Sequence, residues 1–112
     1  MDNNRKRELR EAYKNRHPEM GVIAARCVPA GALFLAPVQD IPARLNRLRF
    51  QLSAGNCGNR KLQALWNRYG QEAVALEVLK RLEYEDPAED HTEELEMLCE
   101  LCLLENPGAE RL

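Results

Sequence analysis

Short apolar runs near the start of the chain predict a β-hairpin. They cover residues 20–28 and 32–38, and Pro29-Ala30-Gly31 separates them with residues typical of a turn. Further along, Val74, Leu76 and Val78 alternate with less apolar neighbours, as a half-buried strand does. The pattern therefore predicts three strands, with a long insertion between the second and the third.

Apolar residues at helical spacing predict two helices in that insertion. The first begins after Asp40, a good N-cap residue, tolerates Pro42 in its first turn, and has one apolar face made by Ile41, Leu45, Leu48 and Leu52. A loop rich in glycine and asparagine follows at residues 55–59. The second helix then ends at Gly70, and its apolar positions are Leu62, Leu65, Trp66 and Tyr69.

Two more helices are expected at the ends of the chain. Residues 3–16 favour a helix that places Leu9, Ala12 and Tyr13 on one side and stops before Pro18. The last helix follows an acidic connection at residues 83–90, with Asp90 or Thr92 as its cap. Its apolar stripe ends before Asn106-Pro107-Gly108 and comprises Leu95, Leu98, Cys99 and Cys102.

Length and composition fit one ordinary globular domain. The 112 residues are 45% hydrophobic and 30% charged, enough for one core but not for two. No apolar run approaches the roughly 18 residues that a membrane span needs, and the charged start of the chain lacks the apolar segment of a secretion signal. We therefore expect a cytoplasmic protein without a membrane partner.

Charge divides the chain into two halves. Residues 1–70 hold 13 lysines and arginines against 5 acids, whereas residues 71–112 hold 3 against 13. A basic half attracts phosphate backbones, and an acidic half binds cations or a basic partner. The alternative is that the two halves pair with each other in the fold, and the sequence leaves both readings open.

The four cysteines are expected to be structural. Cys99 and Cys102 form a C-x-x-C inside a leucine-rich helical pattern, where small thiols commonly pack in the core. A zinc site would have to recruit Cys27 and Cys57 from far away in the sequence. We therefore favour buried, reduced cysteines over metal or redox chemistry.

The order helix, hairpin, two helices, strand, helix resembles the GIY-YIG nuclease superfamily. Specific residues strengthen the likeness to the catalytic domain of phage-type homing endonucleases and to small bacterial proteins related to them. They are Gln39-Asp40, Arg44, Gly55, Lys61-Leu62-Gln63, Trp66-Asn67, Tyr69-Gly70 and the segment 79–85. The resemblance implies an α+β fold in which helices flank a small three-stranded antiparallel sheet, with residues 20–104 as the core of a single domain 1–112 and an extra N-terminal helix over residues 1–18.

The resemblance also implies roles for single residues. Enzymes of the family cut a DNA phosphodiester with one divalent metal, held by a glutamate of the last helix, while an arginine steadies the phosphate. Arg44 matches that arginine, and Glu94 gives the best register for the metal ligand, with Glu93 as the fallback. A carboxylate suits Mg²⁺ or Mn²⁺, and a guanidinium fork suits phosphate oxygens.

The departures from the family pattern concern the groups that handle protons. The two motifs fall on Gly21-Val22-Ile23 and Phe34-Leu35-Ala36, so that Ile23 and Phe34 replace both expected tyrosines. Leu48 stands where a histidine is often found. Loss of a positioned acid or base typically lowers a rate about 10²- to 10⁴-fold. We therefore expect a catalytically degenerate domain that needs no cofactor, and if it is an enzyme, a phosphodiester hydrolase using Mg²⁺ or Mn²⁺.

Three functions remain open at this point. The first is a nucleic-acid-binding module, with DNA as the expected partner and contacts from Arg47, Arg49, Arg60, Lys61 and Arg68 beside Arg44. The second is an active metal-dependent nuclease with an unusual site at Arg44 and Glu94. The third is a protein-interaction domain whose acidic half binds a basic partner or a second copy.

Overall fold

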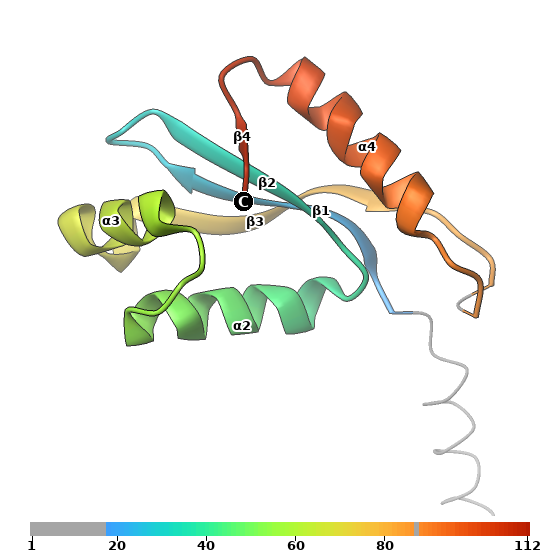
Figure 1. The fold of residues 1–112 in the computed structure, drawn as a ribbon, viewed down its shortest axis with the longest axis horizontal. Coiled ribbons are helices and arrows are strands. Elements are labelled where there is room, and N and C mark those ends of the chain that lie inside the picture. The colour runs from blue at the N-terminus through green and yellow to red at the C-terminus, as the bar shows by residue number, and fades with distance from the viewer. Residues whose placement is uncertain (1–17, 87) are drawn as a thin grey trace, which may run out of the picture.

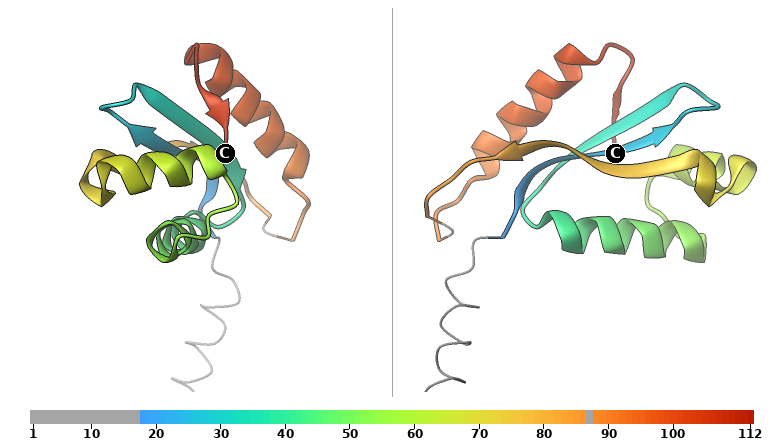
Figure 2. Two further views of the ribbon diagram at one scale, coloured as in Figure 1. Left: turned by 60° about the vertical axis from the view of Figure 1, so that its left-hand side comes forward. Right: turned by 180° about the vertical axis from the view of Figure 1, so that it is seen from behind.

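A computed structural model of the chain describes residues 18–86 and 88–112. The helix expected over residues 3–16 lies outside the described residues. The described part has an α+β fold in which a twisted sheet lies between helices (Figures 1 and 2). Its strands are β1 (Met20–Cys27), β2 (Ala32–Val38), β3 (Val74–Leu82) and β4 (Glu110–Arg111), and its helices are α2 (Ile41–Ala54), α3 (Arg60–Tyr69) and α4 (Thr92–Glu105), with a single 3₁₀ turn at Gln71–Ala73.

The sheet has four strands in the order β3-β1-β2-β4. β1 is antiparallel to both β2 and β3, as expected, but β2 also pairs in parallel with β4, through Phe34 with Glu110 and Leu35 with Arg111. The prediction of a three-stranded antiparallel sheet is therefore wrong in this detail, and the sheet is mixed. A two-residue strand with charged side chains has no apolar alternation that could have indicated it.

The central strand β1 is buried on both faces. Ile23, Ala25 and Cys27 belong to the core under α2 and α3, while Val22 and Ala24 belong to the core under α4. Side chains of a strand alternate between the faces of its sheet, so a strand covered on both sides is apolar along most of its length, and in β1 only Arg26 is charged. The structure is therefore three-layered, with α2 and α3 on one face of the sheet and α4 on the other (Figure 1).

At Gly21 the backbone of β3 leaves no room for a side chain on β1. A Cβ atom built on Gly21 would lie 2.1 Å from the carbonyl oxygen of Lys80, a distance that no side chain tolerates. The pairing of β1 with β3 is irregular next to it, between Val22 and Ile23. This position therefore needs glycine because of the neighbouring backbone.

Local sequence signals set the ends of the two helices on the first face. Asp40 caps α2 by accepting a hydrogen bond from the backbone N–H of Ala43 at 3.2 Å, and Gly55 ends it in a left-handed conformation with φ 79°. Asn59 caps α3 in the same way through the N–H of Leu62. The buried side chain of Gln63 then joins the two helices, because it accepts from the N–H of Cys57 and donates to the carbonyl of Leu52, both at 3.0 Å.

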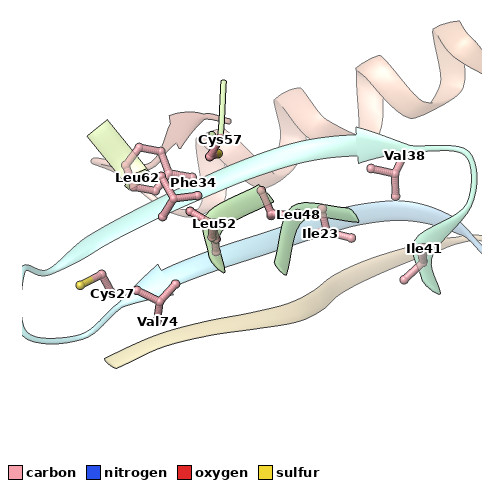
Figure 3. Packing of buried hydrophobic residues seen from close by; sticks show 11 residues of the cluster. Ile23, Cys27, Phe34, Val38, Ile41, Leu48, Leu52, Cys57, Leu62 and Val74 are labelled. Atoms are coloured by element: carbon pink, nitrogen blue, oxygen red, sulfur yellow. The ribbon is translucent and has the colours of Figure 1, made fainter. Parts of the chain in front are cut away.

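The larger core lies between the sheet and α2 and α3 (Figure 3). Phe34, Ile23, Leu48, Leu52 and Leu62 are each at most 1% exposed in this cluster. Tyr69, which the helical spacing placed in the core, is instead 37% exposed, because it is the last residue of α3. Its ring lies 5.3 Å from the guanidinium of Arg68.

Candidate functional site

The first turns of α2 and the end of β2 enclose a pocket of about 410 Å³. Two arginines one turn apart, Arg44 and Arg47, line it from the helix. The strand end and the cap contribute its other lining residues, which are Pro37, Val38, Gln39, Asp40 and Ala43. The predicted phosphate-contacting residue therefore lies in an open hollow.

Arg44 is held in an electrostatically unfavourable place. Burial lowers the pKa of its guanidinium, the positive charge of Arg47 lowers it further, and only the Cys57 thiol acts in the opposite direction. Its Nη1 atom is buried and has no hydrogen-bond partner among the described residues. An unpaired buried donor costs about 1–3 kcal/mol of stability. The two arginines also repel each other, and an anion that enters the pocket would offset this repulsion.

Asp40 and Gln39 belong to this site, although the sequence analysis assigned them no site role. Asp40 lines the same pocket as the two arginines while its carboxylate caps α2. Gln39 Nε2 lies 3.5 Å from the Thr92 hydroxyl at the start of α4, which joins the pocket rim to that helix. Their position four and five residues before Arg44 along the chain is the signal that could have indicated them.

Glu94 is not among the residues that line the Arg44 pocket. It lies in the first turn of α4, and its Oε1 is 3.0 Å from Nδ1 of His91. His91 is buried, and its Nε2 lies 2.7 Å from the carbonyl oxygen of Asp86. The hydrogen bond to the Asp86 carbonyl, followed by that to Glu94, raises the pKa of His91.

The described part of the chain contains no preformed cluster of ligands for a divalent metal. Residues 18–86 and 88–112 contain no group of three or more His, Cys, Asp or Glu side chains placed to share a metal ion. Mg²⁺ is commonly held by one or two carboxylates together with water and substrate phosphates. Glu94 as a metal ligand therefore stays a prediction, and Glu93 beside it is an exposed residue of the same helical turn.

The two residues that the resemblance places at the tyrosine positions of the family lie on the same side of the sheet as α2. Ile23 in β1 and Phe34 in β2 are each 1% exposed and belong to one apolar cluster with Leu48. Leu48 follows Arg44 by one helical turn, so the two share a face of α2. The hydrocarbon side chains thus fill the space between the sheet and the helix that carries Arg44.

The remaining basic residues cover the outside of α2 and α3. These helices contain no acid, and their six basic residues are Arg44, Arg47, Arg49, Arg60, Lys61 and Arg68. Among the ion pairs of the described residues, Lys61 alone of these six has an acidic partner, Glu110, at 2.7 Å. The five that follow Arg44 are all exposed. The basic residues of α2 and α3 therefore form a face that acidic side chains of the described residues largely leave unneutralised.

The opposite face of the sheet is acidic. α4 has five glutamates and no lysine or arginine, and the sheet separates it from α2 and α3 (Figure 2). Pairs between the two halves of the sequence do occur at the sheet, as between Arg26 and Glu77 at 3.0 Å. The helices themselves do not neutralise each other, so the division of charge along the chain becomes a division between two faces.

The four cysteines are free and buried, as expected. Cys99 and Cys102 pack in the core under α4, and burial raises the pKa of both thiols. The described helices include none that is long and apolar enough to cross a membrane.

Comparisons with known proteins identify the fold. No family model matches the chain, and a search of curated proteins finds no match. Among solved structures, the catalytic domain of the homing endonuclease I-TevI superposes with a TM-score of 0.65 and 14% identity, over 83% of this chain and 97% of that domain. A mutant of the catalytic domain of the intron endonuclease I-TevI gives 0.62 and 17% identity, over 78% and 82%. The chain therefore has, over most of its length, the fold of a GIY-YIG homing endonuclease catalytic domain.

Proposed function

We propose that this protein is a nucleic-acid-binding module with a GIY-YIG-like fold that has lost most or all of its nuclease activity. One observation carries the second half of this proposal. Ile23 and Phe34, which the resemblance aligns with the tyrosines of the family, are both buried at 1% exposure in one apolar cluster.

The chemistry of these side chains explains the proposed loss. A tyrosine hydroxyl donates and accepts hydrogen bonds and orients water, which neither isoleucine nor phenylalanine does. Leu48 adds a third hydrocarbon on the side of the sheet that carries Arg44. Each positioned acid or base that is lost lowers a rate about 10²- to 10⁴-fold, so two losses together leave little hydrolysis.

The basic face of α2 and α3 supports the binding half of the proposal. α2, which lines the pocket, and α3 together carry five exposed basic side chains besides Arg44. The glutamates of α4 lie on the opposite side of the sheet. Arg44 and Arg47 repel each other across the pocket wall. Phosphate oxygens would accept from both guanidinium groups and offset that repulsion.

Binding to a labelled DNA duplex and to a single strand at several salt concentrations tests this half. The logarithm of affinity falls with the logarithm of salt concentration by about 0.9 per duplex phosphate that the protein neutralises. Arg47→Gln should therefore weaken binding at low salt and reduce the slope by about one contact. The matched control is Arg81→Gln, which removes the same charge from β3, where Arg81 pairs with Glu19 at 3.6 Å.

If Arg47→Gln and Arg81→Gln lower the affinity for DNA equally, the attraction depends on net charge alone and DNA does not bind to one particular face of the protein. Absence of salt-sensitive binding at low ionic strength would contradict the nucleic-acid part outright. Incubation with plasmid and Mg²⁺ or Mn²⁺ tests the other part, and we expect no cutting. Cutting that Arg44→Ala or Glu94→Ala abolishes would instead establish an active metal-dependent nuclease.

A further inference from the structure

The outer side of α4 is apolar although it faces solvent. Met97, Leu101 and Leu104 are 66%, 54% and 77% exposed. Their spacing of four and three residues aligns them along one side of the helix, and we call them the α4 stripe. The opposite side of the same helix already buries Leu95, Cys99 and Cys102 against the sheet, so the stripe is not needed for the core.

Acidic side chains flank the α4 stripe. From helical periodicity, Glu93 and Glu100 lie along one edge of the stripe, and Glu94 and Glu105 lie along the other. The guanidinium nitrogens of Arg111 lie 2.9 Å from a carboxylate oxygen of Glu96 and 3.9 Å from one of Glu100, and both contacts are on the Glu100 edge of the stripe. A second copy of α4 would bring glutamates against glutamates, so a fitting cover is apolar in its middle and basic at its edges.

We propose that the basic segment of residues 1–17 of the same chain covers the α4 stripe. This segment contains six lysines and arginines against three acids, and α4 contains five acids and no base. Its apolar residues Leu9, Ala12 and Tyr13 recur at helical spacing. Opposite charges at the edges of an apolar seam are the arrangement that pairs two helices.

The place where the segment joins the fold supports this assignment. The carbonyl oxygen of Pro18 accepts a hydrogen bond from the Tyr84 hydroxyl, and the Tyr84 ring lies 4.8 Å from the ring of His91. His91 directly precedes α4. The segment therefore leaves the fold beside the beginning of α4. The helix α4 has 14 residues and is roughly 21 Å long, and a segment of 17 residues is longer than that even when it is helical.

Pairwise cross-linking in the full-length chain tests the proposal. Leu9→Cys, nine residues before Pro18 as Leu101 is ten after His91, is combined with Leu101→Cys in one variant and with Phe50→Cys in the control, since Phe50 is 72% exposed on α2, beyond the sheet. The native thiols are buried, and burial raises the pKa of Cys99 and Cys102, so mild copper-catalysed oxidation reaches the introduced pair first. The products are separated by mass and mapped by proteolysis.

We expect an intrachain disulfide in the Leu101 variant that forms at least tenfold faster than in the Phe50 control. The rate should fall several-fold between 0.15 and 1 M salt, where the screening length drops from about 8 to about 3 Å. Equal rates in the two variants would overturn the proposal, as would a disulfide that forms only between two chains. The second result would assign the α4 stripe to the segment of another copy, which sedimentation of the unmodified protein would show as a dimer.

Discussion

Adding a hydroxyl group at Phe34 tests whether the side of the sheet that faces α2 and α3 is closed to water. Phe34→Tyr adds a single oxygen to a ring that is 1% exposed and packed in a cluster with Leu52, Cys57 and Leu62 (Figure 3). A buried hydroxyl without a partner costs about 1–3 kcal/mol, and fitting an extra atom into a packed core adds about 1 kcal/mol. We therefore expect a loss of about 2–4 kcal/mol in the free energy of unfolding.

Urea unfolding followed by circular dichroism measures this loss. With a slope of about 1–2 kcal/mol per M for a small domain, the midpoint should fall by roughly 1–4 M. The matched control is Phe50→Tyr, which adds the same oxygen to a 72% exposed ring and should change the free energy of unfolding by at most about 0.5 kcal/mol. A Phe34→Tyr variant as stable as its control would mean that the hydroxyl reaches water or a partner, and the inference of a sealed site would then be wrong.

Two further predictions concern the sheet and the start of α4. Gly21→Ala should destabilise the protein by about 2–3 kcal/mol in the same urea assay, because its methyl group collides with the backbone of β3, whereas Gly58→Ala, with no atom near its Cβ position, should cost under about 1 kcal/mol. The pKa of His91 is raised above its ordinary value of 6.5, so the stability that it contributes is fully present below that pH and is lost as the pH rises through the raised value. The difference in free energy of unfolding between the wild type and His91→Gln should shrink over that range, and a pH-independent difference would show that His91 acts by packing alone.

The sequence predicted most of the fold because its signals are local. The alternation at Val74, Leu76 and Val78, the turn before Ala32 and the cap at Asp40 each depend on neighbouring residues, and each is found where it was expected. β3 extends beyond the predicted run to Leu82, because pairing with β1 holds the polar residues at its end in the sheet. Pairing between distant segments has no such local signal, and this also explains why β4 was missed.

The candidate site was only partly accessible from the sequence. Arg44 could be named from the resemblance, and the structure places it in a pocket with Arg47. The partner of Glu94 could not be named, because the hydrogen bond to His91 depends on how the loop before α4 returns to the helix. Whether Ile23 and Phe34 face solvent or the core likewise depends on which helices cover the sheet.

The separation of charge by the sheet gives the described part of this molecule a permanent dipole moment. Its positive end is the pair α2 and α3, and its negative end is α4. In the field of a polyanion such a molecule experiences a torque before any contact is made, and it arrives with the arginines in front. The far side, with α4 and the segment that we propose covers it, then points away from the polyanion.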